Sequence, residues 1–68
     1  MTKFLTDGLL SQISRVRDLI TAYNSLPDGA GLKTATRMGT YVENAEKAIA
    51  TGNIIKMLIS FKRLKSCK

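Results

Sequence analysis

The 68-residue sequence contains no histidine, no tryptophan, one cysteine and one proline. Without histidine, and with a single thiol, one chain can assemble neither an ordinary zinc site nor a disulfide. A chain of this size builds a hydrophobic core that supplies only roughly 3 to 5 kcal/mol of stability without a disulfide, a metal or a partner subunit. Oligomerisation is the remaining source of stability, and we expect a homodimer.

Acidic residues are also scarce, with five Asp and Glu against eleven Lys and Arg and a formal charge of +6. Histidine is the usual general base, and the acids are scattered along the chain. Glu43 and Glu46 could share a helix face, but Glu43 with Lys47 is also an ordinary i,i+4 ion pair. Cys67 lacks a histidine that could activate its thiol. We therefore predict no enzyme, no metal site and no cofactor, while the positive charge keeps anionic partners in view.

Long apolar runs are absent as well. The longest, residues 54–59, contains Lys56 and is far shorter than the roughly 20 residues that span a bilayer. Residues 1–4 lack the charged-then-apolar pattern of a secretory signal. A lone thiol fits a reducing compartment, so we expect a cytoplasmic protein without a membrane span.

Apolar residues recur at helical spacing through three segments. The first set predicts a helix over about residues 3–25, with Thr2 or Thr6 as its cap: Leu5, Leu9, Ile13, Val16, Ile20 and Tyr23. The segment 26–31 then ends this helix, because Pro27 excludes a helical residue before it and two glycines permit positive φ. We interpret Pro27 and Gly29 as turn residues rather than as a phosphate-binding loop.

The second set predicts a helix over about residues 33–51, which packs on another helix: Ala35, Met38, Val42, Ala45 and Ile49. Gly52 suits the left-handed residue that closes a helix, and Asn53 suits the N-cap of the next. We therefore expect a tight antiparallel hairpin with a third helix over about residues 53–66.

The third helix carries two apolar strips. Its expected core face consists of Ile54, Met57, Leu58, Phe61 and Leu64. Ile55 and Ile59 form a second strip beside it, which one small core cannot easily cover. We predict a dimer interface that includes Ile55, Ile59 and Phe61. The fold class is all-α, a single domain of residues 1–68 in which the first helix packs on the hairpin and a dimer completes the core.

Tyr41 is the candidate centre of a protein-binding site. If Met38, Val42 and Ala45 face the core, an adjoining face carries Arg37, Tyr41, Asn44 and Ala48. Tyr and Arg often carry binding energy at protein interfaces, through rigid contact area and bidentate hydrogen bonds. The alternative is that Tyr41 merely flanks the core.

The basic third helix allows two further interpretations. Lys62, Arg63, Lys65 and Lys68 could contact the phosphates of nucleic acid, or could simply complement the negative end of the helix dipole and aid solubility. A DNA-reading helix-turn-helix fits poorly, because the face over residues 54–59 is too apolar to read a major groove. A membrane-surface helix lacks tryptophan and a clear two-faced segregation.

Two stretches, LITAYNSLPDGAG at residues 19–31 and AEKAIATGN at residues 45–53, together with the helix over 57–64, resemble small early proteins of Mu-like temperate phages. The hairpin over 45–64 is also similar to a single tetratricopeptide unit. The phage group includes an anti-quorum-sensing protein, and its members inhibit a LuxR-type transcription activator and the assembly ATPase of type IV pili. This resemblance implies a helical dimer that binds host regulatory proteins in the host cytoplasm. The alternative from the residues is a small basic regulator that binds nucleic acid.

Overall fold

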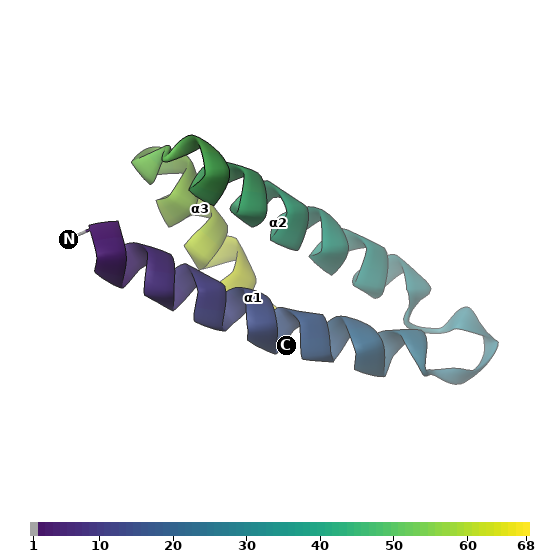
Figure 1. The fold of residues 1–68 in the computed structure, drawn as a ribbon. Coiled ribbons are helices and arrows are strands. Elements are labelled where there is room, and N and C mark those ends of the chain that lie inside the picture. The colour runs from purple at the N-terminus through teal and green to yellow at the C-terminus, as the bar shows by residue number, and fades with distance from the viewer. Residues whose placement is uncertain (1) are drawn as a thin grey trace.

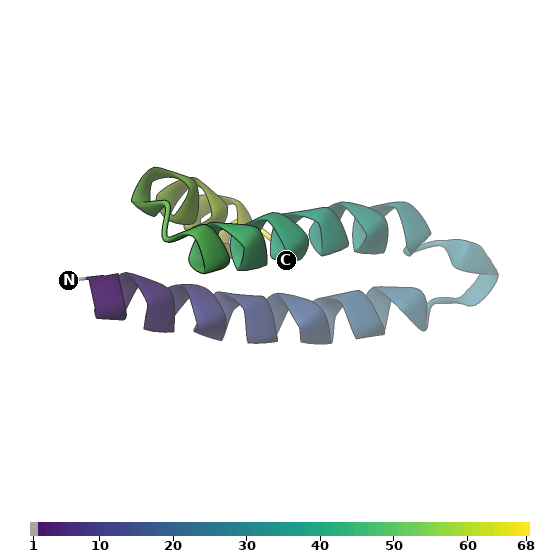
Figure 2. The ribbon, with the colours of Figure 1, turned by 45° about the horizontal axis from the view of Figure 1, so that its top comes forward.

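Three α-helices make up the fold in a computed structural model that describes residues 2–68, with side chains from residue 4 onward. They are α1 (Thr2–Asn24), α2 (Leu32–Thr51) and α3 (Ile54–Lys65), and a short 3-10 turn, η1 (Pro27–Gly29), follows α1. Figures 1 and 2 show α1 and α2 running side by side in opposite directions, with α3 lying against both near the start of α1. The molecule is elongated, 43 × 17 × 15 Å. The predicted all-α fold with a helical hairpin is confirmed.

The turn between α1 and α2 has the backbone that its residues favour. Leu26 is extended (φ −69°, ψ 140°), as a residue before proline should be. Asp28 and Gly29 take positive φ angles of 59° and 68°. Gly31 is buried so close to α1 that an added Cβ atom would clash with the carbonyl oxygen of Tyr23. The loop is therefore a tight connection between two helices in contact.

The connection between α2 and α3 follows the predicted capping pattern. Gly52 has a left-handed φ of 67°, and the N–H groups of Gly52 and Asn53 donate to the carbonyls of Ile49 and Ala48. The Asn53 side chain accepts a 3.0 Å hydrogen bond from the backbone N–H of Lys56. These caps allow α3 to start with only two residues, Gly52 and Asn53, between it and α2. At the start of α1, by contrast, Thr6 lies inside the helix and is not its N-cap, and the side chain of Thr2 falls outside the described residues.

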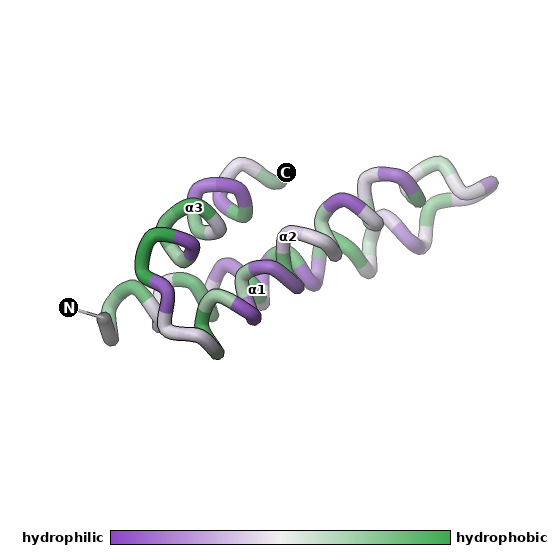
Figure 3. The backbone as a smooth tube through the Cα atoms, turned by 90° about the horizontal axis from the view of Figure 1, so that it is seen from above, coloured by the Kyte–Doolittle hydropathy of each residue, from purple (hydrophilic) through white to green (hydrophobic). Residues whose placement is uncertain are grey.

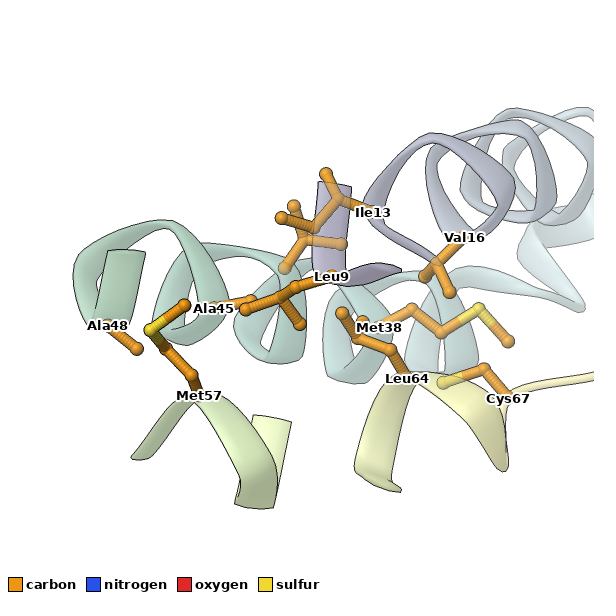
Figure 4. Close-up of a cluster of buried hydrophobic side chains, with 10 residues drawn as sticks. Leu9, Ile13, Val16, Met38, Ala45, Ala48, Met57, Leu64 and Cys67 are labelled. Atoms are coloured by element: carbon orange, nitrogen blue, oxygen red, sulfur yellow. The ribbon is translucent and has the colours of Figure 1, made fainter. Parts of the chain in front are cut away.

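The core forms where all three helices meet, and Figure 4 shows its side chains pointing toward one another. The buried cluster consists of Leu9, Ile13 and Val16 from α1, Met38, Val42, Ala45 and Ala48 from α2, and Met57, Leu64 and Cys67 from α3 and the residues after it. The small Ala45 and Ala48 are almost fully buried, which lets α2 approach its neighbours closely.

Two parts of the predicted core were wrong. On α3, Ile54 and Leu58 are about half exposed, while Ser60, and Cys67 beyond the end of the helix, are buried. The buried face of α3 is therefore rotated from the one with the most aliphatic residues. On α2, Ala48 lies in the core and not on the Tyr41 face, while Ile49 is only partly buried. In both cases the placement of one helix against its neighbours, and not hydrophobicity alone, decides which face is buried.

Candidate functional site

The outer face of α3 carries a concentrated exposed apolar surface, which we call the α3 strip. It consists of Ile54, Ile55, Leu58 and Ile59, which are 50%, 71%, 51% and 46% exposed. Other large exposed apolar residues, Phe4, Leu10, Leu26 and Leu32, are spread over α1, the loop and the start of α2. Figure 3 shows the segregation along α3, whose first half is mainly hydrophobic and whose second half is mainly hydrophilic.

The predicted dimer residues divide between this strip and the core. Ile55 and Ile59 lie on the strip, whereas Phe61 is partly buried and packs against the core. A Cβ atom added at Gly8 would lie 3.3 Å from the Phe61 ring, so this ring fills the space between α1 and α3. Phe61 can contribute to an interface only through its exposed edge.

The basic end of α3 adjoins the strip. Lys62, Arg63 and Lys65 are exposed in the last turn, and Lys68 is exposed beyond it. An open groove of about 460 Å³ joins the two surfaces, and it is lined by Ile55, Leu58, Ile59, Phe61, Lys62 and Lys65. The outward surface of α3 is thus apolar at one end and cationic at the other.

Tyr41 lies on α2 beside α3, with Arg37 and Asn44 exposed on the same helix. Its side chain is half-buried and packs against the core, and the Arg63 guanidinium carbon lies 5.8 Å from its ring centroid. This distance is typical of a cation–π contact. Tyr41 therefore flanks the core, and the residues around it on α2 are exposed, while a protein-binding site at Tyr41 stays a prediction.

Arg15 fixes the far end of α3, a contact that the sequence analysis missed. Its guanidinium donates to the carbonyl oxygens of Leu64 at 2.7 Å and Cys67 at 3.0 Å, and its Nε donates to Gln12. The last carbonyls of a helix lack partners within the helix, and a cation also complements the negative end of its dipole. Tyr23 adds a 2.6 Å hydrogen bond to the Lys68 carbonyl. No local pattern signals the contacts of Arg15 and Tyr23 with the end of the chain, because these partners lie 45 or more residues away.

Glu46 forms a 2.9 Å ion pair with Arg17 that links α2 to α1. This is the only ion pair among the described side chains, so Glu43 and Lys47 do not form one. Both partners of the Arg17–Glu46 pair are more than half exposed, so it contributes little stability.

The described residues contain no group of three or more potential metal ligands of the His, Cys, Asp or Glu type. Within residues 2–68, no helix combines the length and apolarity that a membrane crossing requires.

No protein-family model matches the chain, and no curated protein or solved structure is significantly similar to it.

Proposed function

We propose that this protein is a small inhibitor that acts by binding other proteins, without a catalytic step of its own. The observation that supports partner binding is the half-buried Tyr41 ring with Arg37 and Asn44 exposed on the same helix. The α3 strip, with four large aliphatic side chains about half exposed or more, supports self-association. Covering apolar surface is favourable by about 25 cal/mol per Å². Concentrated apolar surface on a small protein is typical of a contact site.

A second copy of the chain covers the α3 strip in this proposal, with Ile55, Ile59 and the exposed edge of Phe61 in the contact. Two α3 helices in an antiparallel, two-fold arrangement would bring their apolar first halves together. Each basic second half, with Lys62 and Lys65, would extend past the strip of the other copy. Such a dimer hides the apolar surface and places the two basic second halves at opposite ends of the contact.

A host regulatory protein binds on the Tyr41 side of the molecule, through Tyr41, Arg37 and Asn44. The half-buried ring gives this surface a rigid aromatic centre, and Arg37 and Asn44 offer exposed hydrogen-bonding groups beside it. The resemblance to early proteins of Mu-like phages supplies the proposed targets, a LuxR-type quorum-sensing activator and the type IV pilus assembly ATPase. Binding would take place in the host cytoplasm, where the lone Cys67 stays reduced.

Capture from a nuclease-treated bacterial host lysate tests this proposal. Wild type should retain a stoichiometric host protein, identified by mass spectrometry, and should inhibit that protein after purification. Arg37→Glu and Tyr41→Ala should lose it, because they remove a charge and an aromatic contact from the surface. Lys33→Glu is the matched control, since Lys33 is exposed one turn earlier on α2 and changes the net charge equally.

Equal capture by wild type, Arg37→Glu and Tyr41→Ala would reject the Tyr41 surface. Because Tyr41 also packs on the core, its variant is informative only if its circular dichroism remains helical. If Tyr41→Ala loses its helical structure, capture by Arg37→Glu alone decides whether the Tyr41 surface binds the host protein.

A second candidate function is nucleic-acid binding through Lys62, Arg63, Lys65 and Lys68. It is favoured by one observation, that none of these four cations forms an ion pair among the described side chains. Duplex DNA should then bind tightly at low salt and much more weakly at moderate salt, because phosphate contacts release counterions. A Lys62→Glu, Lys65→Glu double variant should flatten that dependence. Absence of binding at low salt would exclude this function.

A further inference from the structure

A depression between α2 and α3 brings cations together without a counter-charge. It has a volume of about 320 Å³ and is lined by Asn44 and Lys47 from α2 and by Lys56, Ile59, Ser60 and Arg63 from α3. Three of these six residues are cationic and none is acidic. The depression lies beside Tyr41, because Arg63 lines it and also lies over the Tyr41 ring.

No carboxylate among the described side chains, Glu43 one turn before Lys47 included, forms an ion pair with this cluster. Glu46, the acid nearest in sequence to Lys47, pairs instead with Arg17 on α1. Within the described side chains, neither Lys47, Lys56 nor Arg63 forms an ion pair. Like charges that converge on one depression repel each other, so folding alone gives no reason to gather them.

Lys56 is also placed against the local helix dipole. It lies in the first turn of α3, where the exposed N–H groups carry partial positive charge and an acidic residue would be favoured. The first turn of α3 contains no acidic residue. A lysine at this position therefore lowers the stability of α3 slightly. An anion bound beside Lys56 would explain why a cation stands there.

The lining supplies hydrogen bonds as well as charge. Arg63 presents a planar fork of donors that matches a carboxylate, and its contact with Tyr41 holds it at the rim. Asn44 adds an amide and Ser60 a hydroxyl. Ile59 gives the depression one apolar wall, which suits the methylene groups of a side chain that carries the anion.

We propose that this depression binds a carboxylate side chain of an acidic segment in the partner protein. The inference rests on the proposed protein-binding function and names the chemistry of the partner. A discrete carboxylate fits one compact cluster with an apolar wall. Duplex DNA would favour cations spaced along a phosphate path, and an anionic membrane would favour a flat surface.

The test uses ¹⁵N-labelled full-length protein and a short amidated peptide in which glutamate pairs flank isolated leucines. Its counterpart replaces every glutamate with glutamine, which keeps size and removes charge. The glutamate peptide should shift the NMR signals of Asn44, Lys47, Lys56, Ser60 and Arg63, and the glutamine peptide should not. Absence of shifts at these residues with the glutamate peptide would overturn the proposal.

Lys56→Glu is the decisive variant because it removes the cation without weakening the fold. A glutamate in the first turn of α3 suits the helix dipole, so stability should hold or rise. Peptide affinity should fall at least about tenfold, the effect of losing one charge-assisted hydrogen bond. Lys33→Glu carries the same change in net charge at a distant exposed site and should bind as wild type does. Equal weakening by both variants would show only a general charge effect and overturn the site.

The same NMR titrations, repeated with duplex DNA and with anionic vesicles, test whether another ligand binds the depression better than the acidic peptide. Duplex DNA or anionic vesicles that shift the same signals more strongly than the peptide would replace the proposal. Capture of the host protein tests the proposed function separately from the acidic-segment site. If Lys56→Glu still captures the host protein that Arg37→Glu loses, the proposed function stands and the acidic-segment site is rejected. If neither wild type nor any variant captures a host protein, the proposed function fails, whether or not the peptide binds.

Discussion

Arg15 shows how one exposed residue can hold a whole element in place. It lies on α1 but hydrogen-bonds the carbonyls of Leu64 and Cys67 at the end of α3. Hydrogen bonds from a charged donor contribute about 1.5 to 3 kcal/mol each, more than neutral ones. These bonds are partly buried, so water replaces them poorly when the guanidinium is removed.

We predict that Arg15→Ala lowers the free energy of unfolding by about 1 to 3 kcal/mol, measured by urea denaturation. Arg17→Ala is the matched control on the same helix, and its exposed ion pair with Glu46 should cost about 0 to 1 kcal/mol. If the two alanine variants lose equal stability, Arg15 does not act as the cap of α3.

Gly31 and Gly39 provide a second comparison at the residue scale. Alanine at Gly31 would force its Cβ against the Tyr23 backbone, whereas nothing lies within 4 Å of a Cβ at Gly39 inside α2. Gly31→Ala should destabilise by about 1 to 3 kcal/mol through overpacking. Gly39→Ala should stabilise by about 0.5 to 1 kcal/mol through helix propensity. Thermal unfolding of both variants checks the prediction, and shifts of the same sign would contradict it.

α3 is the element on which both the fold and the proposed function depend. Asn53 caps its start, Arg15 caps its end, and only one face of its 12 residues enters the core. The opposite face carries the α3 strip. An isolated helix of this length is marginal in water, so its capping contacts and its packing on α1 and α2 must hold it.

We predict that Asn53→Ala destabilises the protein by about 0.5 to 2 kcal/mol, because it leaves the Lys56 N–H without its side-chain acceptor. Asn53→Asp should retain the stability of wild type or exceed it, since a carboxylate accepts the same bond and suits the dipole. Chemical denaturation measures both variants. A loss in Asn53→Asp equal to that in Asn53→Ala would show that the side-chain oxygen is not what matters.

At the scale of the whole molecule, periodicity and capping residues predicted the helices and the hairpin. Spacings of three and four placed Leu9, Val16 and Val42 in the core, and Gly52 with Asn53 marked the second connection. Periodicity could not choose between two apolar faces of α3, because hydrophobicity favours both. The choice depends on how α3 is placed against α1 and α2, which buries Met57, Ser60 and Leu64 on α3 and Cys67 beyond its end.

The candidate site was only partly predictable, for a related reason. The sequence indicated an apolar strip at Ile55 and Ile59 and a basic helix end, since both are local patterns on α3. The depression with Lys47, Lys56 and Arg63 depends on how two helices are placed, and so does the contact of Arg63 with Tyr41. Residues that are distant in sequence converge there, and spacing along one helix does not reveal such convergence.

The α3 strip as a contact between two copies is the central claim about the whole molecule, and sedimentation equilibrium tests it most directly. Wild type should sediment at twice 7.5 kDa, or 15 kDa. Ile55→Lys should sediment at 7.5 kDa while remaining helical, because it puts a like charge into each half of the contact. Leu32→Lys, an equal change at an exposed apolar residue away from α3, should remain dimeric. A 7.5 kDa wild type, or an Ile55→Lys variant that stays dimeric, would contradict the account.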